Sequence, residues 1–407
     1  MPADGLAVTT FPVSSAPTRV RVLSSVAEVA REAWDAVVGV DALPFLRWDW
    51  LNALEASGSA TAATGWQPCH LTLWRGSALV ALAPAYLKHH SLGEYIYDFA
   101  WAEAAESLGV RYYPKLLIGV PLSPITAPRF VAAPGEPPEA ARASLLTAAL
   151  DIARERRCSS VHVVFPPADE AAALEAAGLS RRTGMQFHWR NPGYRTYDDF
   201  LQRFSSKRRH QLRRERAAAE SQGISLETVQ GPALGPEHAL LAYRFYEATC
   251  AKNSWGRLQL TSDFFARAFR TLSPSIELVL AKRSGQVVAG AFNLTHGQRL
   301  FGRYWGCFED HPFLHFNVCL YHSIDACIRE GRESFEPGAG GEHKVARGFE
   351  PTAVHSAHVL FDPRLDRAVR DFVERERAQV EPVLARSEEV AGLRPWKRGE
   401  SRAPRSG

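Results

Sequence analysis

Residues 335–351, FEPGAGGEHKVARGFEP, gather side chains capable of chemistry into one glycine-rich segment. Glu336, Glu342 and His343 are candidate acids and bases, because carboxylates and imidazoles exchange protons in active sites. Lys344 and Arg347 are candidate ligands for a phosphate or a carboxylate. The glycines leave backbone N–H groups uncovered, and these can form a nest for an anion. The segment predicts proton transfer beside a bound anion, whereas the alternative is a surface turn whose ion pairs add little stability.

Two polar residues precede a predicted amphipathic helix over residues 312–331. His315 and Asn317 lie where the N-terminus of this helix can hold a phosphate, although helix capping alone is the alternative. Arg129 belongs to the proline-stiffened segment PLSPITAPRF, a candidate lid from which it can reach a carboxylate.

Three aromatic side chains form a candidate pocket wall. Trp255 lies between two predicted helices, and Tyr304 and Trp305 end a predicted strand. Burial in the core is the other role open to them. The three therefore stay candidate substrate-binding residues.

A strongly basic helix is predicted over residues 200–223, ended by Gly223. Its cations at positions i, i+4 and i+7 share one face. Such a face can bind the phosphates of tRNA or of a nucleotide-linked or lipid-linked substrate, or it can simply be solvated. The candidate phosphate- or tRNA-binding residues are Lys207, Arg208, Arg209, Arg213, Arg214 and Arg216.

The length of 407 residues favours two domains, and the net charge of +4 does not by itself imply a nucleic-acid partner. We expect no signal peptide and no transmembrane segment, since the start has no apolar core and no apolar run is long enough. The six cysteines form no CxxC pair, which predicts reduced thiols in a cytoplasmic protein. No metal is expected, because the His and Cys residues lack ligand spacing.

The elements that must position these residues form a repeated pattern. Residues 69–90 and 276–297 each contain two apolar runs around a Gly-Ser or Ser-Gly turn, which predicts a hairpin. Two helical stretches precede each hairpin, and a helix and a buried strand follow it. We therefore predict two copies of one α/β unit, with the two hairpins in separate sheets.

Four segments of the chain resemble a known family. Residues 120–130, 245–265, 316–351 and 356–362 are similar to the FemAB-like group of predicted N-acyltransferases, often described as peptidoglycan biosynthesis proteins. This group resembles the Fem transferases, which move aminoacyl groups from aminoacyl-tRNA onto peptidoglycan precursors. The resemblance implies two tandem acyltransferase units of the GNAT type. In place of the usual His-Phe-Glu at the helix start, this chain has His315-Phe316-Asn317.

The resemblance implies an enzyme that joins an activated acyl or aminoacyl group to an amine of a peptide, peptidoglycan-like or small-molecule acceptor. No cofactor is implied; aminoacyl-tRNA, acyl-CoA or an acyl carrier protein is the donor. Two alternatives stay open: a non-catalytic Fem-like binding protein, and a GNAT acyltransferase that uses an acyl thioester. The oligomeric state is left open.

We divide the chain by composition and by the repeated pattern. The predicted parts are a disordered start (1–18), a first GNAT-like unit (19–192), a basic linker helix (193–223), a second GNAT-like unit with a C-terminal helix packed along it (224–387) and a disordered tail (388–407).

Overall fold

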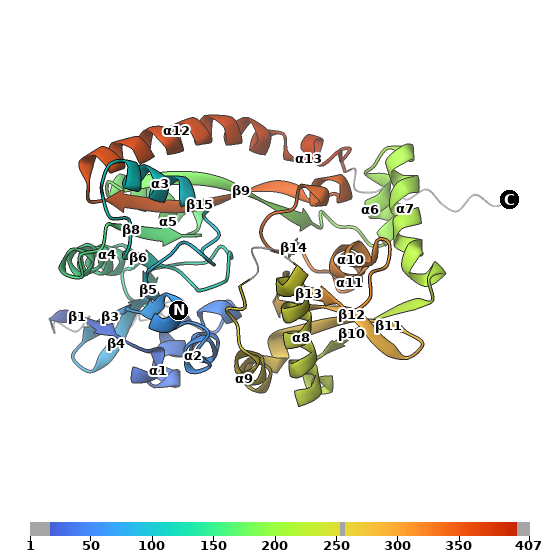
Figure 1. The fold of residues 1–407 in the computed structure, drawn as a ribbon, viewed down its shortest axis with the longest axis horizontal. Helices are drawn as coiled ribbons and strands as arrows, with labels where there is room; N and C mark the ends of the chain where they lie inside the picture. Colours follow the sequence, from blue (N-terminus) through green and yellow to red (C-terminus); the bar gives the residue numbers. More distant parts are fainter. Residues whose placement is uncertain (1–16, 253–256, 397–407) are drawn as a thin grey trace, which may run out of the picture.

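The computed structural model describes residues 17–252 and 257–396 (Figure 1). Two sheets organise these residues: an 11-stranded sheet in the order β10-β11-β12-β13-β14-β9-β15-β8-β6-β5-β2, and a four-stranded sheet in the order β1-β3-β4-β7. The mixed α/β class is confirmed. No described helix is both long and apolar enough to cross a bilayer.

The strands alternate with helices along the chain. The strands are β1 (Thr18–Leu23), β2 (Trp66–Pro68), β3 (His70–Arg75), β4 (Ala78–Ala83), β5 (Ala85–Lys88), β6 (Lys115–Ile118), β7 (Val131–Ala132), β8 (Ser160–Val164), β9 (Ser180–Arg190), β10 (Ile224–Gln230), β11 (Ile276–Arg283), β12 (Gln286–His296), β13 (Arg299–Cys307), β14 (Ser334–Glu336) and β15 (Glu350–Leu360). The helices are α1 (Arg31–Val38), α2 (Trp48–Ala56), α3 (Phe99–Ser107), α4 (Pro138–Glu155), α5 (Ala168–Ala176), α6 (Tyr197–Gln202), α7 (Ser206–Ser221), α8 (Pro236–Lys252), α9 (Ser262–Leu272), α10 (Leu314–Phe316), α11 (His322–Arg329), α12 (Pro363–Ala385) and α13 (Ser387–Val390).

The duplicated pattern is visible in the strand pairing. Most neighbouring strands are antiparallel, but β6 pairs parallel with β8, and β13 pairs parallel with β14. A helix connects each parallel pair, α4 in the first copy and α10 with α11 in the second. The two helix pairs that precede the hairpins also meet, because α2 packs on α9. The chain therefore repeats one α/β unit.

The two predicted hairpins lie in different sheets, as expected. β3 and β4 belong to the four-stranded sheet, whereas β11 and β12 belong to the 11-stranded sheet. However, Pro84 separates β4 from β5, and β5 joins the large sheet beside β2 and β6. The large sheet is thus continuous through strands of both copies.

The two units exchange strands near the end of the chain. β15 lies between β8 and β9 and is antiparallel to both, although it belongs to the second half of the chain. β9 in turn pairs with β14 on its other edge. Figure 1 shows β9 and β15 running side by side across the upper half of the molecule.

The C-terminal helix packs differently from the prediction. α12 lies along β9 and β15, and its buried Leu365, Val369 and Val373 contact Trp101 of α3 and neighbouring apolar residues. It therefore covers the exchanged strands and part of the first unit, because the exchange carries β15 there. Residues 388–396 of the predicted tail are described: the backbone N–H of Arg394 donates to the carbonyl of Arg203, at 2.7 Å. Residues 1–16 and 397–407 lie outside the described part, and the predicted unit boundaries stay a prediction.

Candidate functional site

A cleft opens where the parallel pair β13–β14 ends. The two strands pair from Arg299 with Ser334 to Phe301 with Glu336, and then they diverge. Gly302 lies at the point of divergence, and a Cβ there would meet the Cα of Pro337 at 3.2 Å. A cavity of about 640 Å³ fills the space between the strands. We call it the β13–β14 cleft.

Both units of the chain line the β13–β14 cleft. One wall is Arg303, Tyr304 and Trp305 of β13, and the opposite wall is the glycine-rich loop after β14. The remaining lining residues come from the segment before α3, from Pro124, from α8, from the start of the helix that contains α10 and from the turn Glu342–Arg347. They are Tyr95, Tyr97, Pro124, Tyr246, Thr249, Cys250, His315, His343 and Lys344.

Two imidazoles of the cleft are uncharged at neutral pH. Burial, with the neighbouring His343 and the cations Lys344 and Arg347, lowers the pKa of His315 to about 4. Burial and the cations Lys344 and Arg347 also lower the pKa of His343 below its usual 6.5. The two rings lie 5.6 Å apart, and the His315 ring lies 4.3 Å from Trp305. The cleft therefore contains neutral imidazoles that can accept a proton.

The glycine-rich loop lines the cleft with residues whose backbone amides have no acceptor within the described chain. Gly338, Gly340 and Gly341 have φ values of +86°, +71° and +88°, a conformation that residues with a Cβ rarely adopt. Among the described residues, no acceptor pairs with the backbone N–H groups of residues 338–341. Lys344 holds the loop from within, since its Nζ donates to the carbonyls of Gly338 at 2.8 Å and Pro337 at 3.4 Å. Burial lowers the pKa of Lys344 to about 8.

Arg347 and Asn317 were expected to bind substrate, but neither lines the cleft. Both side chains are instead held by hydrogen bonds to other parts of the protein. Arg347 donates to Glu215 at 2.7 Å and to the Tyr321 hydroxyl at 2.9 Å, and its guanidinium lies 3.4 Å from the centre of the Phe316 ring. Asn317 lies in a π-helical turn and donates through Nδ2 to the carbonyl of Glu215 at 2.8 Å. The two residues join the loop and this turn to α7.

The two candidate acids of the loop lie elsewhere. Glu342 is exposed and lines none of the described cavities. Glu336 is only 4% exposed and lines a different cavity from His343. Arg299 donates to its Oε1 at 2.5 Å. The structure therefore brings His315, His343, Lys344, Tyr304 and Trp305 together, but not Glu336, Glu342 or Asn317.

The corresponding gap of the first unit is closed by its own chain. Arg129 is 1% exposed, and its guanidinium donates to the carbonyls of Val164 and Ile125, each at 2.6 Å. The backbone N–H of Ala127 also donates to Phe165 after β8. Arg129 thus holds the PLSPITAPRF segment beside the end of β8 and contacts no cavity described here. Trp255 lies outside the described residues.

The basic helix α7 carries two kinds of cation. Arg213 pairs with Asp198 at 2.9 Å, and Arg216 pairs with Asp325 at 3.3 Å. Arg208 donates to Gln211 of the same helix at 2.9 Å. The remaining candidates have no partner within the described residues. They are Lys207, Arg209 and Arg214.

Sequence reasoning missed Tyr95, Tyr97 and Tyr246 in the cleft. Tyr95 and Tyr97 adopt positive φ values of 62° and 53°. Their segment is fixed by buried Lys115, whose Nζ donates to Glu94 at 2.7 Å and to Asp98 at 2.5 Å. Two tyrosines between two acids, in the run from Glu94 to Asp98, are the signal that could have identified this segment.

The chain is similar to known proteins over most of its length. The FemAB-like family model, described as peptidoglycan biosynthesis/recognition, matches residues 25–397. No curated protein matches. FemX, a solved structure, is 12% identical over 86% of this chain and 100% of its own, with a TM-score of 0.49. L-PGS from Bacillus licheniformis is 11% identical over 80% and 95%, with a TM-score of 0.49. A tandem GNAT protein from the clavulanic acid biosynthesis pathway is 12% identical over 85% and 99%, with a TM-score of 0.42.

Proposed function

Because the chain belongs to the FemAB-like family, we propose that it transfers an activated acyl or aminoacyl group to an amine in the β13–β14 cleft. One observation carries this proposal: His343, which is neutral, and the unpartnered backbone amides of residues 338–341 line the same cavity. Acyl transfer needs both a proton acceptor and a partner for the oxyanion.

The proposed reaction assigns one role to each group. The acceptor amine attacks the carbonyl carbon of the donor ester or thioester, and the carbonyl oxygen becomes an oxyanion. Backbone N–H groups of the loop donate to this oxyanion. His343 takes the proton from the attacking nitrogen and returns it to the leaving oxygen or sulfur as the intermediate collapses. Trp305 and Tyr304 form the wall against which the donor lies.

The donor is proposed to carry phosphates. Lys207, Arg209 and Arg214 lie unpaired on α7, within the described chain, and can meet the phosphates of aminoacyl-tRNA or of coenzyme A. The acceptor is a peptide, a peptidoglycan-like molecule or a small amine. A cytoplasmic location stays a prediction from the cysteines.

The test is the His343→Ala variant, assayed with mixed aminoacyl-tRNA and with acyl-CoA as donors and with a panel of amines. Losing a general base lowers the rate by about a hundredfold to ten-thousandfold. Exposed His89, replaced as His89→Ala, is the matched control and should keep the wild-type rate. Glu342→Gln measures separately whether the exposed carboxylate contributes.

Two results would contradict the proposal in different ways. An unchanged rate in His343→Ala removes the histidine as the base. Tight binding of a donor without any transfer by the wild-type chain supports the rival possibility, a binding protein that kept the fold.

A further inference from the structure

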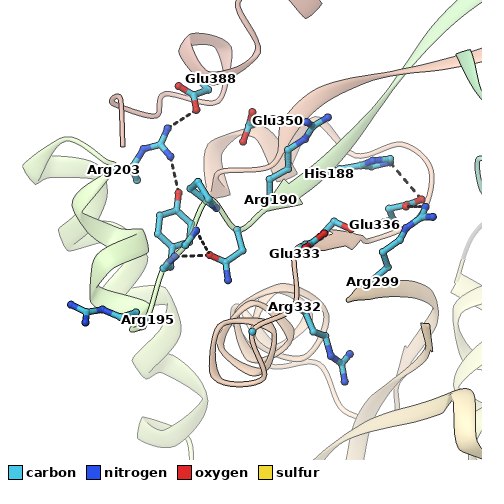
Figure 2. Close-up of a pocket in the computed structure, with 16 residues that line it drawn as sticks. His188, Arg190, Arg195, Arg203, Arg299, Arg332, Glu333, Glu336, Glu350 and Glu388 are labelled. Carbon is cyan, nitrogen blue, oxygen red and sulfur yellow. Dashed lines mark hydrogen bonds and ion pairs between the residues drawn. The ribbon is translucent and has the colours of Figure 1, made fainter. Parts of the chain in front are cut away.

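A second and larger cavity lies on the other side of residue 336. It has a volume of about 960 Å³ and is lined by residues from β9, β13, β14 and the start of β15 (Figure 2). The turn after β9, residues 331–333, Arg203 and Glu388 complete the lining. It shares no lining residue with the β13–β14 cleft. We call it the β9–β14 groove.

The strand register arranges acids and bases in two rows on one face of the sheet. Glu350 pairs with His188 across β15 and β9, and Glu336 follows on β14, 4.0 Å from the imidazole. In the next row, Arg190 pairs with Ser334, and Ser334 pairs with Arg299. An acidic row therefore lies beside a basic row, two residues along the strands, or about 7 Å.

Part of this charge has no partner within the described chain. Glu336 is 4% exposed, and its Oε2 accepts no hydrogen bond. Its Oε1 is occupied by Arg299. Glu350 makes no ion pair and accepts only a hydrogen bond of 3.4 Å from Ser387. Arg190 is exposed and makes no ion pair. Unsatisfied charge of both signs thus meets in one cavity, and a buried carboxylate oxygen without a donor is costly.

His188 does not supply the missing cation. Its Nε2 lies 3.1 Å from Oε1 of Gln186, which can only accept, so the ring proton points to Gln186. Burial lowers the pKa of His188, which leaves the ring neutral near pH 7. Figure 2 shows His188 and Arg299 on two sides of Glu336, and Arg190 beside Glu350. The second carboxylate oxygen of Glu336 is therefore a buried acceptor without a donor, in the wall of the groove.

We propose that the β9–β14 groove binds a short zwitterionic peptide, such as a dipeptide, or a free amino acid. The ligand's ammonium lies between Glu336 and Glu350, and its carboxylate lies against Arg190. A ligand with only a negative charge would be repelled by Glu336 and Glu350. A ligand with only a positive charge would leave Arg190 without a partner. Neighbouring residues of a peptide have Cα atoms about 3.8 Å apart, so the two ends of a dipeptide can span both rows. This binding does not depend on the proposed transfer reaction.

The experiment measures binding to the full chain by isothermal titration calorimetry at pH 7. The probes are L-alanyl-L-alanine, its N-acetyl derivative, which lacks the ammonium, and its amide, which lacks the carboxylate. We expect the dipeptide to bind about tenfold or more tightly than either derivative, because each derivative loses one charged hydrogen-bond partner. Glycine distinguishes a free amino acid from a peptide end. Inorganic phosphate tests for a site that takes any anion.

Three variants locate the bound dipeptide. Glu336→Gln keeps an oxygen for Arg299 but replaces the free carboxylate oxygen, and should weaken dipeptide binding about tenfold or more. Arg190→Gln, an exposed change that spares the fold, should weaken it similarly. Glu374→Gln, an exposed acid on α12, is the control and should leave affinity unchanged. Any of four results overturns the inference: the dipeptide does not bind, its two derivatives bind as tightly as it does, phosphate binds more tightly, or Arg190→Gln keeps wild-type affinity.

Discussion

Asn317 shows how one side-chain amide fixes the relation between three segments. Its Nδ2 donates to the carbonyls of Glu215 and Phe313, at 2.8 and 3.1 Å, and the residue is 1% exposed. A carboxylate cannot donate to a carbonyl. Beside buried Glu215, a Glu or Asp at this position would also add a second negative charge. The departure from His-Phe-Glu in this chain therefore suits a structural donor.

We predict that Asn317→Asp destabilises the fold, since it removes both hydrogen bonds and buries a charge without a partner. The free energy of unfolding should fall by about 2 kcal/mol or more, measured by urea denaturation. Asn191→Asp is the matched control, because Asn191 uses its Oδ1 to accept from Gly193 and Tyr194, and Asp retains that oxygen. Equal stability of the two variants would contradict the role of Asn317.

Glu336 and His343 line different cavities, which the sequence alone could not predict. The segment is correctly identified as chemically rich, because its composition is local information. Side chains alternate across a strand, however, and β14 ends at Glu336. Glu336 therefore faces the β9–β14 groove while the following loop turns into the cleft. Arg347 likewise finds its partner Glu215 across 132 residues, a contact that no local pattern contains.

At the scale of elements, the ion pairs of α7 separate its cations into two sets, and this allows a test of phosphate binding. Replacing Lys207, Arg209 and Arg214 together with Gln should weaken the binding of unfractionated tRNA. It should also reduce the slope of log affinity against log salt by about 2 to 3, since each of the three lost phosphate contacts contributes about 0.7 to 0.9. Arg213→Gln with Arg216→Gln is the control, because Asp198 and Asp325 already pair with these arginines. A slope equal in both variants means that α7 does not contact the nucleic acid.

A histidine pair joins β8 to β15 in the buried part of the sheet. Nδ1 of His162 lies 2.6 Å from Nδ1 of His358, and Ser160 and Ser356 hold the outer nitrogens at 2.7 Å. Burial lowers the pKa of His162 to about 3 and that of His358 well below 6.5. Neither ring accepts a second proton in the folded state at mildly acidic pH.

We predict that this pair destabilises the protein as the pH falls. The unfolded chain binds protons at these histidines below pH 6.5, whereas folded His162 does so only near pH 3. Stability is therefore lost across that window, by about 2 kcal/mol for His162 at pH 5. His162→Asn should flatten the fall of the melting temperature between pH 6.5 and 5. Parallel curves for the variant and the wild type would contradict this origin.

For the whole molecule, the exchanged strand predicts that the first unit does not fold alone. Residues 17–223 lack β15, which leaves a gap between β8 and β9. We expect this fragment to show no cooperative thermal transition by circular dichroism. Co-expression with residues 224–407 should restore a folded complex. A cooperative melt of the isolated fragment would show that β15 is dispensable for the first unit.

The repeated pattern of helices and strands could be predicted because apolar periodicity and glycine turns are local. At the start of α9, for example, the Thr261 side chain accepts from the backbone N–H of Phe264, a local contact within three residues. The insertion of β15 between β8 and β9 could not be predicted, since apolar strands of similar length fit several neighbours. The packing of α12 follows from that insertion and was missed with it.

The position of β15 also constrains how such a chain can change over generations. After a duplication, two independent copies can diverge, recombine or be lost one at a time. Here the last strand of one copy completes the sheet of the other, so neither copy can be deleted or exchanged as a cassette. The first copy, in which Arg129 holds a segment beside β8, also supplies β9, the strand with which β14 of the second copy pairs.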